Sequence, residues 1–367
     1  MKIELIDLRK RFQEEGTEII KCIKKVLKKG NLILTEEVDN FEKLICEYTG
    51  AKYCLGVNSG TDALMMSLWA NGIGRGDEVI TTPISFIASI GAIIHVGAKP
   101  VFVDVGDDLN INPDLIENAI TSRTKAIMPV HWTGRICNME KITKISNRYK
   151  LAVIEDAAQS MGSYYNNKHG GTFGKVSAFS AHPLKNLNAI GDSGFIITDN
   201  KNIYNKVKLY RNHGLEGRDN VAIFGINSRL DSINAEVLSY RLKRLDSIIN
   251  RRIKNINLYR KFIKTNKVII PKDKKNEKNS YVMFINICEK RNELQSYLNS
   301  KGIQSLVYYG TPLHLHKASK KLGYKKGDFP NAERICSKVL ALPHHQHLKK
   351  KEIKYVCESI NKFYTLN

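Results

Sequence analysis

The chain has 367 residues, of which 42% are hydrophobic and 26% charged, so it can bury a large core and is neither disordered nor fibrous. Its formal charge of +22 raises nucleic-acid binding as an option. However, the lysines are spread along the chain without a DNA- or RNA-binding motif, and we expect no such partner. An apolar run of about 20 residues and a signal-peptide core are both missing, so we expect a cytoplasmic protein with no membrane contact.

The first part of the chain predicts helices, one short strand and a turn that suits an anion. We expect helices at 5–29, 36–48 and 63–70 and a strand at 53–57. Between the strand and the third helix lies Ser59-Gly-Thr61. Gly60 lets the backbone approach a phosphate, while Ser59 and Thr61 add hydroxyls at the positive end of a helix. A plain helix cap explains the same residues equally well.

From residue 77 onward, short apolar strands alternate with helices. We expect strands at 78–82, 100–104, 126–130 and 151–155, and helices at 86–94, 113–119 and 139–149. This rhythm is typical of a mostly parallel sheet with helices on both faces. Ligands of such sheets bind beyond the carboxyl ends of the strands, where 59–61, Phe86 and 156–159 fall. We therefore expect these three features to share one pocket.

Two residues in this region are candidates for chemistry. Asp156 follows a buried strand directly, so it is either a cap for the next helix or a buried acid paired with a protonated ring nitrogen. Lys185 lies on a loop between strands at 176–179 and 195–198. A lysine there can lose its solvent, have its pKa lowered and attack a carbonyl, although most loop lysines point into water.

The remainder of the chain predicts a smaller α+β domain. We expect helices at 203–211, 232–262, 291–301, 331–340 and 350–363, strands at 280–287 and 304–308, and a charged surface loop at 272–279. We place a large domain at 1–244 and a small one at 245–367, with the N-terminal helix packing against the latter. The seven cysteines are scattered without a CxxC pair, and His344–His347 has no second ligand group nearby. We therefore expect reduced thiols and no metal.

Four motifs, in this order and spacing, resemble those of the DegT/StrS-type sugar aminotransferases, which are pyridoxal-phosphate enzymes of the aspartate aminotransferase fold. They are Ser59-Gly-Thr-Asp-Ala-Leu64, Glu155-Asp-Ala-Ala-Gln159, Phe179-Ser-Ala-His-Pro-Leu-Lys185 and Gly225-Ile-Asn-Ser-Arg229. The resemblance runs nearly end to end. It implies an α/β large domain with a seven-stranded, mostly parallel sheet between helices, plus the small domain.

The resemblance also implies roles for single residues. Lys185 looks like the lysine that binds pyridoxal 5'-phosphate as a Schiff base and then moves a proton. Asp156 should pair with the pyridine nitrogen, Phe86 should stack on the ring, and Gln159 should lie against the ring or its phenolic oxygen. The phosphate should be held by Ser59, Gly60, Thr61 and Ser180, and by Asn227 of a neighbouring subunit, which makes the protein a homodimer with shared sites.

The activity implied is transfer of the amino group of L-glutamate to a keto (or aldehydo) sugar. We expect the sugar to be nucleotide-linked and the product to serve amino-sugar or surface polysaccharide biosynthesis, such as lipopolysaccharide. Lys185 separates the chain from sugar dehydrases, which carry histidine there, and Gly191-Asp192 resembles enzymes that aminate C3 rather than C4. A sugar acid of the octulosonate type is the alternative substrate, and a non-catalytic ligand-binding regulator is the more distant alternative function.

Substrate contacts are implied less specifically. The candidates are Asn31, His182, Arg229 and His314. His182 and His314 could equally be packed structural histidines. The chain departs from the family at Ala181, where an aromatic residue is usual, and we expect this change to reshape the sugar pocket.

Overall fold

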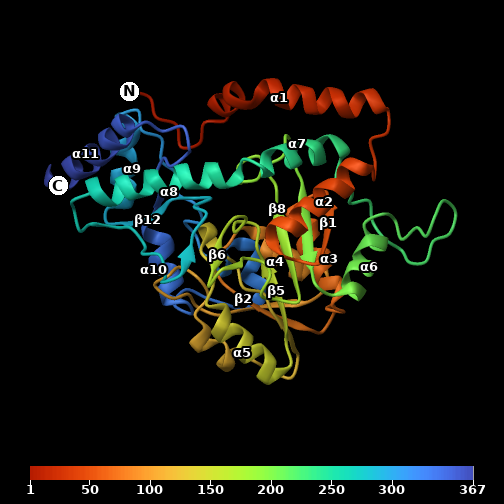
Figure 1. Ribbon diagram of the computed structural model, residues 1–367. Helices are drawn as coiled ribbons and strands as arrows, with labels where there is room; N and C mark the ends of the chain where they lie inside the picture. The colour runs from red at the N-terminus through yellow and green to blue at the C-terminus, as the bar shows by residue number, and fades with distance from the viewer. Residues whose placement is uncertain (367) are drawn as a thin grey trace.

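A seven-stranded sheet forms the centre of the computed structural model, which describes residues 1–366 (Figure 1). Its strands follow the order β1 (Tyr53–Val57), β9 (Gly194–Thr198), β8 (Val176–Ser180), β5 (Ala152–Asp156), β4 (Thr124–Ile127), β2 (Glu78–Thr81) and β3 (Lys99–Phe102). The five strands from β8 to β3 are parallel, and β9 runs antiparallel to both of its neighbours. The expected α/β fold with a mostly parallel sheet is confirmed.

Both faces of the sheet are buried because successive strand residues point to opposite sides. In β5, Ile154 belongs to a core shared with α3 (Gly60–Ala70) and α4 (Ile87–His95). Its neighbour Val153 belongs to a second core with α5 (Met139–Tyr149). This arrangement explains why the strands are short, continuous apolar runs rather than alternating ones.

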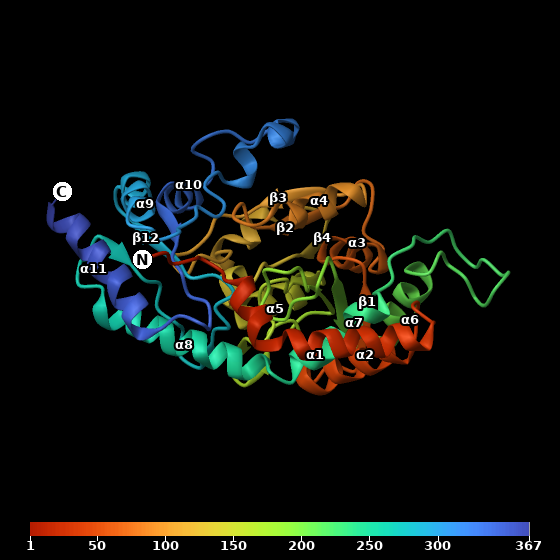
Figure 2. The ribbon, with the colours of Figure 1, turned by 90° about the horizontal axis from the view of Figure 1, so that it is seen from above.

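Further helices cover the β1 end of the sheet. They are α1 (Leu8–Lys29), α2 (Glu36–Thr49), α6 (Lys201–Tyr210) and α7 (Ser232–Leu242). The helix α2 packs on β1 and on α7, and α1 lies against α7 on the outside (Figure 2). The loop between α6 and α7 projects away from the body of the chain in both views.

The C-terminal unit has its own core and its own small sheet. The antiparallel strands are β10 (Val268–Ile269), β12 (Ile285–Cys288) and β13 (Val339–Ala341), in that order. The helices are α8 (Leu245–Phe262), α9 (Arg291–Ser300), α10 (Pro330–Lys338) and α11 (Lys350–Leu366). This unit is the smaller α+β part expected, and the exact division at residue 244 stays a prediction.

The N-terminal segment reaches both parts of the molecule. Ile3 pairs with Ile303 and lies in the C-terminal core, so the first residues join that unit. The helix α1 itself packs along α7, and its Glu14 contacts Arg251 of α8 and His347. The stretch before α1, together with Glu14, therefore links the N-terminus to the C-terminal unit.

The single long helix expected over 232–262 is wrong. A turn at Lys243 and Arg244 divides it into α7, which packs on α1 and α2, and α8, which packs on α11. No proline or glycine marks the break, and apolar residues continue through it. The two halves bury their apolar faces against different partners, which a pattern of apolar spacing does not reveal.

The strand expected at 280–287 forms only at its end, as β12, because the backbone before it is used elsewhere. Ser280 donates its N–H to Ser163 Oγ, 3.1 Å away, and its carbonyl accepts from Asn186 Nδ2 at 2.9 Å. The residues at 304–308 likewise make only one bridge, between Leu306 and Ala341, instead of a strand. Hydrogen bonds to Ser163 and Asn186 therefore replace strand pairing at the start of the first segment.

Two shorter expectations also differ from the structure. The helix expected at 113–119 is a pair of 3-10 turns (Pro113–Leu115 and Glu117–Ala119), with Ile116 as the only fully buried apolar side chain between them. The surface loop at 272–279 includes β11 (Glu277–Lys278), which adds a strand to the hairpin of β6 (Tyr164–Tyr165) and β7 (Lys168–His169). Within residues 1–366, no helix is both long and apolar enough to cross a membrane.

Candidate active site

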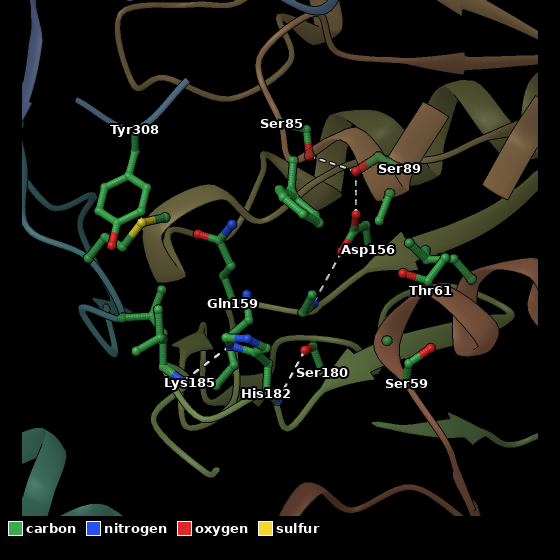
Figure 3. Close-up of a pocket in the computed structure, with 18 of the residues that line it drawn as sticks. Ser59, Thr61, Ser85, Ser89, Asp156, Gln159, Ser180, His182, Lys185 and Tyr308 are labelled. Carbon is green, nitrogen blue, oxygen red and sulfur yellow. Dashed lines mark hydrogen bonds between the residues drawn. The ribbon is translucent and has the colours of Figure 1, made fainter. Parts of the chain in front are cut away.

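A cavity of about 310 Å³ lies at the carboxyl ends of the parallel strands (Figure 3). The three features that the strand pattern placed there, 59–61, Phe86 and 156–159, all contribute to its lining. Ser180, His182, Lys185 and Asp192 line it from the loop after β8, and Met283, Tyr308 and Tyr309 line it from the C-terminal unit. The structure therefore brings these segments around one space.

The start of α3 offers hydrogen-bond donors to an anion in this cavity. Ser59 caps the helix, because its Oγ accepts from the N–H of Asp62 at 3.0 Å. The first N–H groups of a helix have no partner within it, and the helix end is electropositive. A Cβ added to Gly60 would lie 2.7 Å from the Cβ of Ser180, so the helix start rests directly against the end of β8. Glycine is required there for this close approach.

Asp156 is a buried acid at the end of β5, with 5% of its surface exposed. Its Oδ1 accepts from the N–H of Ala158 at 3.2 Å, and its Oδ2 accepts from Ser89 Oγ at 2.6 Å. Burial raises the pKa of Asp156, while the bond from Ser89 acts in the opposite direction. The Ala158 contact is a local cap. Each oxygen accepts only one of these bonds and can accept another, so the acid is able to pair with a cation in the cavity.

Lys185 faces the same cavity from a constrained loop. Its backbone N–H donates to the carbonyl of His182 at 2.8 Å, and the next residue, Asn186, is held by the guanidinium of Arg252 on α8. Burial lowers the pKa of Lys185 to about 8, and the negative charge of Asp156 opposes that shift. About a tenth of the amine is therefore uncharged at pH 7, far more than for an ordinary lysine, and the uncharged form is the nucleophile toward a carbonyl.

Phe86 and Gln159 present a flat face and an amide to the cavity. The Phe86 side chain is 57% exposed and lines the cavity, so it is free to contact a ligand ring. Gln159 Oε1 accepts from the N–H of Thr133 at 2.9 Å, which fixes the amide. Its nitrogen lies 3.4 Å from Tyr309 Oη, at the cavity wall.

Several residues predicted from the sequence lie elsewhere in this chain. Asn31 and Asn227 are exposed on loops outside the cavity lining, and Arg229, half-buried, donates to Asn212 Oδ1 at 3.1 Å. His314 is fully buried, with Nε2 3.1 Å from Glu333 Oε1, so it is a packed residue and not a contact of the cavity. His182 does line the cavity.

The expected effect of Ala181 on the sugar pocket is wrong for this chain. Ala181 has no exposed surface and packs in the core with Phe179 and Leu187, facing away from the cavity. His182 and Asp192 remain the polar residues of this loop that border the open side. Side chains alternate between the two sides of the extended backbone after β8. For this reason His182 lines the cavity while its neighbour Ala181 faces the core.

Sequence reasoning missed four polar residues of the lining, which are Ser85, Ser89, Tyr308 and Tyr309. Ser85 and Ser89 are four positions apart around the start of a helix, but serines at such spacing are too common to draw notice. Tyr309 has a positive φ of 57°, an unusual conformation for a bulky residue. Because the segment before it was expected to be a strand, its turn into the cavity was not foreseen.

Comparisons with known proteins agree on one family. A sequence model described as the DegT/DnrJ/EryC1/StrS aminotransferase family matches residues 13–361. The chain is 38% identical to a pleiotropic regulatory protein of Geobacillus stearothermophilus over 368 residues, which is 99% of each chain. It is 39% identical to dTDP-3-amino-3,6-dideoxy-alpha-D-galactopyranose transaminase of Aneurinibacillus thermoaerophilus over 362 residues, covering 98% of this chain and 99% of the relative.

A solved structure repeats the fold over the whole chain. The crystal structure of S. venezuelae DesV in complex with a ketimine intermediate superposes with a TM-score of 0.96 and 34% sequence identity. The match covers 99% of this chain and 98% of that one. The large sheet and the C-terminal unit therefore follow a known architecture.

Proposed function

Because the chain belongs to the DegT/DnrJ/EryC1/StrS aminotransferase family, we propose that it moves the amino group of L-glutamate to the keto carbon of a nucleotide-linked sugar, with pyridoxal 5'-phosphate as cofactor. The observation that carries this proposal is Lys185, an amine with a pKa of about 8, in the same cavity as the buried acid Asp156. An uncharged amine near a buried acid suits carbonyl chemistry on a protonated nitrogen heterocycle.

The residues present fit this cofactor. The unpartnered N–H groups at the start of α3, with Thr61 and Ser180 beside them, suit its phosphate, and Gly60 provides the close approach. Phe86 would contact the ring face. The bound cofactor supplies a carbonyl that captures an amino group and a ring that accepts electrons during the transfer.

Each protein group then has a separate task. Asp156 would hold a proton on the ring nitrogen, since its burial makes an unpaired negative charge costly. The Lys185 amine would bind the cofactor between turnovers and would carry a proton between the substrate carbon and the cofactor carbon during them. Gln159, fixed by Thr133, would direct its amide toward the oxygen beside the ring.

For the sugar, we favour amination at C3. The Gly191-Asp192 pair and the name of the Aneurinibacillus relative, a 3-amino sugar transaminase, support this position. His182 and Asp192 border the cavity where a sugar hydroxyl would lie. A sugar acid of the octulosonate type is the alternative acceptor.

We further propose that two copies of the chain share their sites. Asn31 and Asn227 lie on exposed loops outside the cavity, as does the half-buried Arg229. The loop before Asn227 projects from the body, and its Phe224 has 97% of its surface exposed. A large apolar side chain in that position is better explained by contact with a second copy than by solvent.

The first test is spectroscopic. The purified protein should take up pyridoxal phosphate and become yellow, whereas Lys185→Ala should bind it without the absorbance of a covalent adduct. A wild-type protein that stays colourless with excess pyridoxal phosphate would refute the proposal.

The second test identifies the substrate. The enzyme should be incubated with glutamate and a panel of nucleotide-linked 3-keto and 4-keto sugars and an octulosonate-type keto acid, with products identified by mass spectrometry and NMR. We expect an amino sugar from the 3-keto acceptors and consumption of glutamate in equal amount. Cofactor binding without product from any pair of donor and acceptor would instead favour a regulatory role.

A further inference from the structure

Two buried serines form a chain of hydrogen bonds that ends on Asp156 (Figure 3). Ser85 Oγ lies 2.6 Å from Ser89 Oγ, and Ser89 Oγ lies 2.6 Å from Asp156 Oδ2. The two serines are only 3% and 1% exposed, although both border the cavity. None of the motifs that suggested the chemistry includes either serine.

The direction of this chain follows from the acid at its end. An ionised carboxylate only accepts hydrogen bonds, so the hydroxyl of Ser89 must donate to Asp156. The oxygen of Ser89 then becomes the acceptor for the hydroxyl of Ser85. Hydrogen bonds aligned in one direction polarise each other, so Ser85 strengthens the bond that Ser89 makes.

The two donors to Asp156 approach different oxygens. Ser89 donates to Oδ2 and the N–H of Ala158 donates to Oδ1, so the plane of the carboxylate is fixed from both sides. Each oxygen accepts about two bonds, which leaves capacity toward the cavity that Asp156 lines. The titratable groups near the acid are Lys185 and Tyr309 in the cavity, and His131, which is already engaged by Glu155 at 2.8 Å.

We propose that Ser89, supported by Ser85, is a positioning residue that keeps Asp156 ionised and oriented to hold the proton on the cofactor's ring nitrogen. The catalytic role of Ser89 rests on the proposed function, whereas the hydrogen bond between Ser89 and Asp156 does not depend on that function. Ser85 directly precedes Phe86, and Ser89 lies in the first turn of α4. The segment 85–89 thus places both Phe86, which would contact the ring, and Ser89, which donates to Asp156.

The test compares four variants with the wild type. Ser89→Ala removes the bond to the acid, Ser85→Ala removes only its support, and Ser89→Thr keeps a hydroxyl. Ser67→Ala is the control, since Ser67 is a fully buried serine of α3 whose hydroxyl has no hydrogen-bond partner within the described residues. Circular dichroism and thermal unfolding establish that each variant is folded.

The first readout needs no cofactor. In the cofactor-free protein, the Asp156 carboxyl carbon is assigned in ¹³C NMR by its loss in Asp156→Asn, and its titration is followed. Ser89→Ala should move the midpoint to higher pH because a bond that favours the charged form is gone. Ser85→Ala should move it less, and Ser89→Thr and Ser67→Ala should leave it near that of the wild type.

The second readout uses the holoenzyme loaded with cofactor labelled with ¹⁵N in the ring. Ser89→Ala should shift the ring-nitrogen signal toward its unprotonated position, and kcat should fall about 10- to 100-fold, the range for losing a hydrogen bond to a charged group. Glutamate KM should change little. Wild-type protein that binds no cofactor would refute the proposed function and leave the first readout decisive for the serines.

An unchanged titration of Asp156 in folded Ser89→Ala would overturn the inference. The same holds if Ser67→Ala lowers kcat as much as Ser89→Ala does, because the effect would then be one of packing and not of hydrogen bonding to the acid.

Discussion

Lys185 and Asp156 lie in one cavity, and burial affects the two in opposite directions. Burial disfavours charge, so it lowers the pKa of the amine to about 8 and raises the pKa of the acid. Each charge also favours the other, which limits both shifts. An amine that is partly neutral next to an acid that is kept charged is the combination that Schiff-base chemistry on a protonated ring needs.

The rate of cofactor capture should therefore depend on pH. The protonated amine does not attack a carbonyl, so the rate at which cofactor-free protein becomes yellow should rise through a midpoint near pH 8 and then level off. In Asp156→Asn the midpoint should move to lower pH, because the negative charge that favours the ammonium form is lost. Stopped-flow absorbance at several pH values measures the midpoint in the wild type and in the variant. A wild-type rate that does not change from pH 6 to pH 10 would contradict the expectation.

Glu155, next to Asp156 but on the opposite side of β5, has a structural task. It has no exposed surface and accepts hydrogen bonds from the N–H groups of Gly171 and Phe173, from Ser177 Oγ and from His131 Nε2. These bonds lower the pKa of Glu155 despite its burial. The acid therefore fixes the loop that leads into β8 and, beyond it, to Lys185.

Replacing this acid by its amide should destabilise the fold strongly. Glu155→Gln brings N–H donors against N–H donors and removes the charge, so we expect a loss of about 3–5 kcal/mol in the free energy of unfolding. Glu140→Gln is the matched control, because Glu140 is exposed and, among residues 1–366, pairs only with Lys144, one turn further along α5. For Glu140→Gln, the loss in the free energy of unfolding, measured with urea, should stay below about 0.5 kcal/mol. Equal losses in both variants would show that Glu155 is not the centre of this network.

At the scale of elements, the distance between the start of α3 and the end of β8 shapes the proposed phosphate site. Gly60 begins the helix at the point where Ser180 ends the strand. A Cβ on Gly60 would lie 2.7 Å from the Cβ and 3.1 Å from the Cα of Ser180, and a backbone atom does not move aside easily. The helix start, and not the serine, would have to shift.

Gly60→Ala should therefore weaken cofactor binding. Overpacking of this kind costs about 1–3 kcal/mol, so we expect an increase in cofactor Kd of about tenfold or more, with the rest of the fold intact. Gly91→Ala in α4 is the control, since nothing lies within 4 Å of its added Cβ. That variant should bind cofactor normally and gain up to about 1 kcal/mol in stability from helix propensity. Fluorescence titration with pyridoxal phosphate measures the cofactor Kd of both variants.

At the scale of the whole molecule, the chain has a cavity on one side and unused polar residues on projecting loops. Asn227 and Asn31 lie on surface loops, and Phe224 in the α6–α7 loop is almost fully exposed. Closed symmetric dimers bury such surfaces on both copies at once. In such a dimer each cavity would receive polar groups from the partner.

Mixing two inactive variants tests the shared site. Lys185→Ala and Asn227→Ala should each be nearly inactive alone, but refolding them together should restore about a quarter of wild-type activity, because half of the dimers are mixed and each holds one complete site. Mixing Lys185→Ala with the double variant carrying both changes should restore none. Failure of the first mixture to recover, with dimers present by ultracentrifugation, would place Asn227 outside the partner's site.

The pattern of the sequence was sufficient for the sheet and for the residues at strand ends. Apolar runs separated by helices define a parallel sheet, and the residue that follows each run must lie at its carboxyl edge. Asp156 and Ser59–Thr61 could be placed for that reason, and the loop between two strands placed Lys185. These are local relations between neighbours in the chain, which the sequence contains directly.

Tertiary structure decided what those residues meet. The bond from Ser89 to Asp156 joins positions 67 residues apart, and Tyr309 reaches Gln159 across 150. The break between α7 and α8 arises because the two helices bury their apolar faces against different partners. The strand at 280–284 is lost because Ser280 bonds to distant residues instead. Apolar spacing records which face of a segment is buried, but not against what. The sequence by itself therefore determined the sheet and the positions of the lysine and the acid that we propose as catalytic. Only packing between distant segments determined that Ser89 bonds to Asp156 and that Tyr309 contacts Gln159.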